Sequence, residues 1–571
     1  MRRSAIGYCK DNLMPTNDSA AGDVWKIPEP SLSPKVADAT GALELLSDSP
    51  AARNHIAAML RGDGADSRKL AATAARALTL WPAFRVALVE AERSDVRALE
   101  RRMHSAEFPE TLLDPLFESV MRRTVVPDLS IERLVTILRR LYLQRTENPD
   151  YRLEGEHLRI VVSLACQCFN NEYIYAVSRI EEEAVERLGS RLRERIADST
   201  CNELAGDLAV YGMYVPLWKL SEGGKLPAIL SLGADPYLNE LIARQVREPH
   251  EEAAIREEIE SFGMSEDPVS AAVRRQYEES PYPRWFSLRL KPPVRFSDAI
   301  TERFPFLCPI ETNDPVKILV AGCGTGQHPL QVATKYRNAD IVAIDFSKAS
   351  LAHAIRQARR RNLPNIAFRH GDLLCVDRLR TQFDVVEAVG VLHHMADPIA
   401  GLKALCAVLR PGGFMKIGLY STRARQRLSR AKSLAESHPP GCSPDQLRTM
   451  RQEILATGDP IHLTSSDFFY TSGFRDLLRH AHEVGFTPAG LKPILANLGL
   501  RFLGYRNVRA GSRAAYRDRF PEDPAMRDLE LIDEFESGNP RMFPSLQVFW
   551  VRKEGSTGDA ARDSESPAPV P

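Results

Sequence analysis

Three glycines on alternate positions follow a short apolar run in the segment ILVAGCGTGQHPL, residues 318–330. Gly322, Gly324 and Gly326 carry no side chain, so the backbone there can turn tightly and a ligand can touch it. The helical pattern that follows places free backbone N–H groups and partial positive charge at the same point. The segment therefore predicts a site for a cofactor with a negatively charged group.

A carboxylate ends the next strand-like run, IVAIDFS. Asp345 lies about 20 residues beyond the glycines, where an acid can accept hydrogen bonds from both ribose hydroxyls of a nucleoside. The alternative is that Asp345 caps the helix predicted over SKASLAHAI. Glycines and acid together fit two cofactors: a dinucleotide held by its pyrophosphate, or S-adenosylmethionine held by its methionine carboxylate.

The elements that position these residues alternate between strand-like and helical runs from Asp314 onward. This alternation predicts an α/β fold with parallel strands and with helices on both faces of the sheet. The predicted strands are VKILVAG, DIVAIDFS, IAFRHGD, FDVVEAVG and FMKIGLYS, followed by residues 499–507 and 545–553. The helices between the first five are QHPLQVATKYR, SLAHAIRQARRR and PIAGLKALCAVLR.

Residues 31–262 have a helical pattern and predict an all-α domain, with one apolar stripe along IERLVTILRRLYL. Two similar segments, beginning at Ala42 and Ala77, are about one tetratricopeptide period apart. A TPR-like array is therefore one interpretation, and a bundle of unrelated amphipathic helices is the other.

The remaining segments differ in composition from these two domains. We expect a connector at 263–314, which contains the aromatic and Pro-rich SPYPRW, and an α/β domain at 315–553 with a helical insertion at about 423–497. Both ends of the chain, 1–30 and 554–571, are polar and predict disorder.

Three later motifs distinguish between the two cofactors. Asp372 follows the third strand in HGDLL, GVLHHMADP follows the fourth, and LRPGGF precedes the fifth. Together with the glycines, they resemble the class I S-adenosylmethionine-dependent methyltransferases over about Val316–Ser421. The resemblance implies a Rossmann-like sheet of seven strands ending in an antiparallel pair, with S-adenosyl-L-methionine as cofactor. It also implies that Asp372 reaches the adenine amino group.

A narrower resemblance extends to RRQYEESPYPRWFSL and to FRDLLRHAHEVGFTPAGLKPILANLGLRFLGY. Both look like bacterial methyltransferases fused behind a helical or tetratricopeptide-like domain. In one respect the chain departs from many class I enzymes, because Val320 stands where an acid meets the methionine amine. Backbone carbonyls are one alternative for meeting the amine, and Glu387 at the end of the fourth strand is the other. On the second hypothesis, Glu387→Gln is expected to weaken cofactor binding. The resemblance implies these cofactor-binding residues: Gly322, Cys323, Gly324, Gly326, Gln327, Asp345, Phe346, Asp372, Leu373 and Glu387.

The acceptor of the methyl group should lie beyond the fourth and fifth strands. His393, His394 and Tyr420 are the candidate catalytic residues there, as general bases or as pocket walls. In this fold the segment before the first strand often lies over the cofactor, so Tyr282, Arg284 and Trp285 are candidates for a lid that contacts the substrate. The alternative is that Trp285 packs as a rigid hinge between the two domains.

Composition narrows the range of partners. Lys+Arg and Asp+Glu both total 75, so the net charge is zero, which argues against nucleic acid as a partner.

No secretory signal and no membrane helix are expected, so the chain is predicted to be cytoplasmic. The scattered cysteines, including the CxC pair Cys166 and Cys168, predict buried free thiols and no metal site. The helical domain favours a protein acceptor, with a small molecule or a dimerisation role as alternatives.

Overall fold

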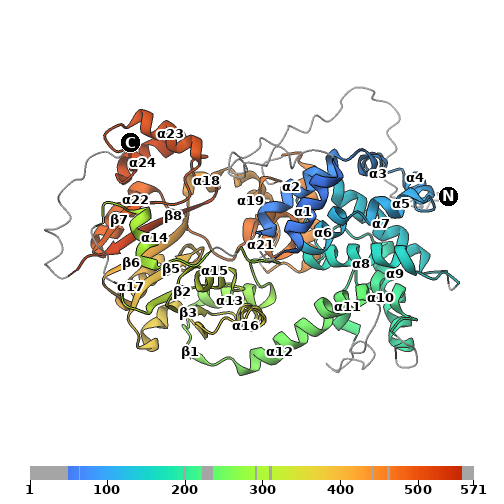
Figure 1. The fold of residues 1–571 in the computed structure, drawn as a ribbon, viewed down its shortest axis with the longest axis horizontal. Helices are drawn as coiled ribbons and strands as arrows, with labels where there is room; N and C mark the ends of the chain where they lie inside the picture. The colour runs from blue at the N-terminus through green and yellow to red at the C-terminus, as the bar shows by residue number, and fades with distance from the viewer. Residues whose placement is uncertain are drawn as a thin grey trace, which may run out of the picture. The chain divides into compact units, whose positions relative to one another are not determined.

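A computed structural model describes residues 49–62, 65–148, 150–196, 201–220, 236–289, 292–307, 312–439, 441–459 and 463–555. These residues belong to one compact unit of the chain. Figure 1 shows a group of helices, coloured blue to green, and a twisted sheet with helices around it, coloured green to red.

The N-terminal helices, here called the helical layer, precede the sheet in sequence. In α7, Asp128 caps the first turn by accepting from the backbone N–H of Ser130 and Ile131, and the apolar stripe predicted for this segment is buried. Most of these helices share one hydrophobic core, as expected for a helical region before the sheet. The layer comprises α1 (Pro50–Arg61), α2 (Ser67–Leu80), α3 (Pro82–Glu92), α4 (Val96–Arg102), α5 (Glu107–Leu112), α6 (Pro115–Arg123), α7 (Leu129–Arg145), α8 (Gly155–Asn170), α9 (Arg179–Arg195), α10 (Ala205–Tyr211), α11 (Pro236–Ile242) and α12 (Glu248–Glu258).

The sheet confirms the predicted α/β class. Its strands follow the order β1-β4-β3-β2-β5-β6-β8-β7. Pairing is parallel from β1 to β6, and β8 runs antiparallel to both of its neighbours. The seven predicted strands are β2 (Val316–Ala321), β3 (Ala339–Asp345), β4 (Ile366–Gly371), β5 (Phe383–Val389), β6 (Leu409–Tyr420), β7 (Leu500–Tyr505) and β8 (Leu546–Lys553).

Within the described residues the sheet has eight strands, one more than the expected seven. The additional strand, β1 (Ser261–Gly263), pairs with the open edge of β4. Three residues are too few to show the period-two alternation that identifies a strand, so the pattern of the sequence carried no signal for β1. This strand brings the chain from α12 directly to the edge of the sheet.

Helices cover both faces of the sheet. On one face, α14 (Phe296–Arg303), α15 (Gln327–Lys335) and α16 (Lys348–Arg360) bury apolar residues against β2, β3 and β5. On the other face lie α17 (Pro398–Val408), α22 (Pro488–Asn497), α23 (Ala510–Arg519) and α24 (Leu529–Gly538). From the connector, α13 (Pro268–Glu279) packs against α16.

The segment predicted as a helical insertion at 423–497 divides between two places. Its first helices are α18 (Thr422–Gln426), α19 (Ser429–Glu436), α20 (Pro444–Ala456) and α21 (Thr471–Leu478). Leu447, Phe468 and Leu477 from this part belong to the same hydrophobic core as the helical layer. Arg451 reaches Glu132 of α7 with two hydrogen bonds of 2.7 Å. By contrast, α22 packs on α24 and β7.

Several other expectations concern the ends and the cysteines. Cys166 and Cys168 are buried free thiols, as expected. No helix in the described ranges is long and apolar enough to cross a membrane. The segments expected to be disordered, 1–30 and 554–571, lie outside the described residues apart from Glu554 and Gly555. The first TPR-like segment, from Ala42, also falls largely outside them, so that interpretation stays a prediction.

Candidate active site

The glycine loop, residues Gly322–Gly326, connects β2 to α15. Gly322, Gly324 and Gly326 have φ of +66°, +53° and +93°, a backbone region that favours glycine. A Cβ atom at Gly322 would lie 2.2 Å from Val391 Cγ2, and one at Gly324 would lie 2.7 Å from the backbone oxygen of Tyr282. Gly326 begins α15 as its N-cap residue. The loop therefore needs bare backbone for both its turn and its close neighbours.

Asp345 holds this loop in place. Its Oδ2 accepts from the Gly324 N–H at 2.8 Å, and its Oδ1 accepts from the Ser347 N–H at 2.9 Å. The N-cap of α16 is Ser347, whose hydroxyl accepts from Ser350, so Asp345 does not cap that helix. Burial raises the pKa of the Asp345 carboxyl to about 6. The acid stands at the tip of β3, as predicted for a ribose-binding residue.

Asp372 leaves one oxygen available to a ligand. Its Oδ1 accepts from the Leu374 N–H at 2.9 Å, and the Ser265 backbone also favours the ionised form of the carboxyl, while Oδ2 is buried and makes no hydrogen bond of good geometry with the described residues. Burial also raises the pKa of this carboxyl. An unpaired buried acceptor carries a free-energy cost of about 1–3 kcal/mol, which a bound donor such as an amino group removes. The residues thus fit the adenine end of S-adenosyl-L-methionine.

The other predicted cofactor residues lie around the same loop. Cys323 is buried, and its N–H donates to Ile344 O at 2.9 Å. Gln327 is the first residue of α15, and Leu373 begins the turn after β4. The Phe346 ring faces the Tyr277 ring at a centroid distance of 6.3 Å.

Glu387 lies in a buried ionic group beneath the glycine loop. In the sheet, Glu387 of β5 is paired with Val320 of β2 and with Lys416 of β6, so its side chain emerges on the same face as Val320. Its Oε2 accepts from Lys416 Nζ and from His328 Nε2, both at 2.5 Å. These partners hold the pKa of the Glu387 carboxyl far below its usual value despite burial. An acid therefore stands on the strand next to position 320, on the same face of the sheet.

The SPYPRW segment crosses the glycine loop. Trp285 Nε1 donates to Thr325 O at 3.1 Å, and Thr325 Oγ1 donates to Pro283 O at 2.5 Å. Trp285 is 3% exposed and packs with Leu288, Leu330 and Ala358. Arg284 instead contacts the helical layer, with its guanidinium 3.7 Å from Glu172 and over the ring of Phe169. The segment thus has features of both predicted roles, a cover over the loop and a packed hinge.

The predicted catalytic residues gather where β5 and β6 end. The rings of His393 and Tyr420 have centroids 3.9 Å apart, and those of His393 and His394 are 4.2 Å apart. Burial lowers the pKa of both histidines, well below its usual value in His393 and to about 4 in His394, so both are neutral at pH 7. We call these three residues, together with Tyr277, Asp476 and His480, the acceptor-side cluster.

Three members of this cluster were not singled out from the sequence, although they lie in the two segments that carry the narrower resemblance. Tyr277 Oη donates to Asp476 Oδ1 at 2.8 Å, and the Tyr277 and His480 rings lie 5.7 Å apart. Tyr420 Oη donates to Asp476 Oδ2 at 3.4 Å. Tyr277 comes from α13, Asp476 from α21 and His480 from the turn after α21. Because no local spacing connects these segments, only tertiary structure could bring them together.

The helical layer also reaches this part of the site. Arg68 of α2 pairs with Asp467 at 2.5 Å, and Asp467 also accepts from the hydroxyl of Tyr470. The Tyr470 ring stacks on that of Tyr282 at 6.4 Å. Glu172 accepts from the N–H and hydroxyl of Ser472, at the start of α21. Residues of the helical layer therefore support the segments that surround the acceptor-side cluster.

Comparisons with known proteins agree with this geometry. A family model described as a methyltransferase domain matches residues 318–413. An uncharacterized protein of Synechococcus sp. is 28% identical over 305 residues, covering 49% of this chain and 72% of that protein. The 27-O-demethylrifamycin SV methyltransferase of Amycolatopsis mediterranei is 28% identical over 120 residues, covering 21% of this chain and 43% of that protein.

Among solved structures, PKMT2 from Rickettsia typhi is 15% identical and has a TM-score of 0.34, with 46% of this chain and 54% of that chain covered. The likeness at this score carries no functional argument. The chain spans less than half the length of the rifamycin methyltransferase that it matches. Each comparison therefore covers less than half of this chain, and the activity of the whole chain has to be argued from its own residues.

Proposed function

Because residues 318–413 match a family model described as a methyltransferase domain, we propose that this chain transfers the methyl group of S-adenosyl-L-methionine to an acceptor bound at the acceptor-side cluster. The observation that carries the proposal is the bare glycine loop after β2 together with the buried Oδ2 of Asp372 after β4, the two strands that flank β3 in the sheet. A domain of this class takes S-adenosyl-L-methionine as its cofactor.

The residues around the loop have distinct roles in this proposal. The glycine loop accepts the methionine end against its backbone, Asp345 accepts from the ribose hydroxyls, and Asp372 accepts from the adenine amino group. Glu387, held ionised by Lys416 and His328, attracts the methionine amine. The cover formed by Pro283 and Trp285 keeps the loop away from water.

When bound, the cofactor supplies a methyl group on a positively charged sulfur. Charge is lost during transfer, so the chain contributes most by holding the acceptor in contact within a dry site, which can supply about 7–11 kcal/mol of the barrier. The buried His393 and Tyr420 rings provide such a surface. If the acceptor must lose a proton, neutral His393 is the general base, and this adds about 10²–10⁴ in rate.

The acceptor that we propose is a protein side chain recognised together with the helical layer. Support comes from Arg68 and Glu172, which connect that layer to the segments around the acceptor-side cluster. One observation favours a small-molecule acceptor as the second candidate: His393, Tyr420 and Asp476 are each less than a tenth exposed. A third candidate is a regulatory protein that binds the cofactor without turnover. The absence of an acid at position 320, where Val320 stands, is the observation in its favour.

Two measurements test the proposal. Calorimetry with S-adenosylmethionine, S-adenosylhomocysteine and NADH should show binding of the first two only. Incubation with methyl-labelled cofactor in a cell extract, resolved into protein, RNA and small-molecule fractions, should place the label in protein. Label confined to small molecules would replace the protein acceptor by the second candidate. Binding without any transfer would favour the regulatory protein, and preferential NADH binding would overturn the proposal altogether.

A further inference from the structure

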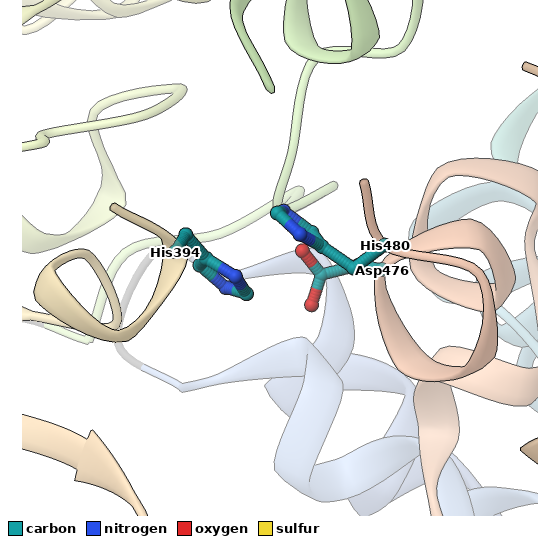
Figure 2. A group of neighbouring side chains, drawn as sticks. All are labelled: His394, Asp476 and His480. Atoms are coloured by element: carbon teal, nitrogen blue, oxygen red, sulfur yellow. The ribbon is translucent and has the colours of Figure 1, made fainter. Parts of the chain in front are cut away.

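His394, Asp476 and His480 form a group with the composition of a metal site. One ring nitrogen from each histidine and one carboxylate oxygen lie within 4.8 Å of one another. His394 follows β5, whereas Asp476 and His480 belong to α21 and the turn after it. Figure 2 shows the three side chains pointing toward one another from these two segments. All three are buried to about nine-tenths, at 6%, 5% and 9% exposure.

A single carbonyl group orients both imidazoles. Nδ1 of His394 and Nδ1 of His480 lie 2.8 and 2.6 Å from the same acceptor, the backbone oxygen of His482. The His480 Nδ1 is also 3.1 Å from the His482 nitrogen, but the contact with oxygen is the shorter one. A carbonyl oxygen can only accept, so we assign the proton of each ring to Nδ1. Each Nε2 atom then carries a lone pair, which is how metal-binding histidines are usually held.

Two phenols orient the carboxylate in the same way. Tyr277 and Tyr420 donate one hydrogen bond each to the two oxygens of Asp476, which leaves further lone pairs on both. Tyr277 Oη also lies 3.1 Å from His480 Nε2. Its only proton goes to the carboxylate, so two acceptor atoms face each other there. A cation bound at Nε2 would relieve this unfavourable contact.

We propose that His394, Asp476 and His480 bind one Zn²⁺ ion. Two imidazoles and one carboxylate are ligands that Zn²⁺ accepts, and three protein ligands leave a position open, as in zinc sites that bind a further molecule. The site is empty in this structure, where the two rings stack with centroids 3.6 Å apart. Binding requires the rings to rotate so that both Nε2 atoms face the ion.

The position of the ion indicates a role, and this part of the inference rests on the proposed methyl transfer. His394 touches His393 and Tyr420, which border the acceptor in that proposal. A Zn²⁺ ion here would bind an oxygen or nitrogen of the acceptor in its open position and fix its orientation. The acceptor class is then one with a metal-binding heteroatom next to the atom that is methylated.

The test measures metal binding directly on the full chain. Protein treated with EDTA and then dialysed is titrated with Zn²⁺ by calorimetry, and bound metal is counted by mass spectrometry. We expect one ion per chain, with affinity reduced at least about tenfold in Asp476→Asn and in His480→Gln. His438→Gln, which alters a histidine paired with Glu453 outside the cluster, should leave affinity unchanged.

Folding and function are separated by further readouts. Circular dichroism and thermal melting without metal establish that each variant is folded, and Zn²⁺ should raise the melting temperature of the parent but not that of Asp476→Asn. Equal Zn²⁺ affinity in parent and both variants, or no binding by the parent, overturns the metal site. Cofactor binding measured in EDTA does not depend on the metal site. If Zn²⁺ binds but no methyl transfer occurs, the result counts against the proposed function and not against the metal site.

Discussion

The cofactor side and the acceptor side of the site differ in the sequence distance between the residues that form them. Glycine loop, Asp345, Asp372 and Glu387 all belong to successive strand ends of one sheet. The acceptor-side cluster takes Tyr277 from the connector, His394 from the turn after β5, and Asp476 from a helix that shares its core with the helical layer. The cofactor side is therefore formed by local turns after strands, whereas the acceptor side depends on packing between segments that are distant in the sequence.

If this comparison is right, the largest effect on cofactor binding comes from the glycine loop. Gly322→Val places a branched side chain at φ +66° and against Val391, so affinity for S-adenosylhomocysteine should fall more than about 100-fold by calorimetry. Gly511→Ala is the matched control, because nothing lies within 4 Å of an added Cβ there. Binding retained in Gly322→Val would mean that the loop is not the cofactor site.

The next largest effect should be on the free energy of unfolding, and it concerns the helical layer that supports the acceptor side. Arg451→Ala leaves Glu132 buried without its partner between α20 and α7, so the free energy of unfolding should drop by about 3–5 kcal/mol in urea titrations. Arg179→Ala, at an exposed pair with Glu183, should change it by less than about 0.5 kcal/mol. Where the variant is folded, its cofactor affinity should equal that of the parent. A loss of affinity would show that the cofactor half also depends on the helical layer.

A smaller effect tests the unpartnered oxygen of Asp372. In Asp372→Asn the amide can keep the hydrogen bond from Leu374, but it presents a donor where the adenine amino group also donates. Affinity for S-adenosylhomocysteine should fall about 10- to 100-fold. Asp377→Asn, at an exposed position in the same turn, serves as control. Equal affinities in the two variants would remove Asp372 from the adenine site.

The smallest effect is a pH dependence of cofactor binding. Burial raises the pKa of Asp345 to about 6, so its carboxylate is ionised above that pH and protonated below it. Since the ionised form accepts both ribose hydroxyls, affinity should fall about tenfold from pH 7 to pH 5. The slope should be reduced in Asp345→Asn. Burial raises the pKa of Asp372 as well, and it contributes to the slope in both proteins, so their difference isolates Asp345. Identical slopes would contradict the prediction.

Sequence patterns were sufficient for the sheet and for the residues at its strand ends. Apolar runs bounded by glycine and acid identify β2 to β6, because each strand and the turn after it are encoded within a few residues. Burial of Trp285 agrees with one of the two predicted roles of this residue, that of a packed hinge. The three-residue strand β1 was missed, because it is defined only by the edge that it pairs with. The insertion is helical as predicted, but its packing in two places was not anticipated.

Residues that meet only after folding were outside the reach of such patterns. His328 and Lys416 had no role until the sheet register placed them beside Glu387, and Asp476 and His480 had none until α21 packed near β6. By itself, the sequence determined the class of the fold, the cofactor that suits it and the strand ends that would hold it, because periodicity and turn chemistry act over a few residues. Only the tertiary structure decided what surrounds the acceptor, because contacts between remote segments depend on packing that no local spacing records.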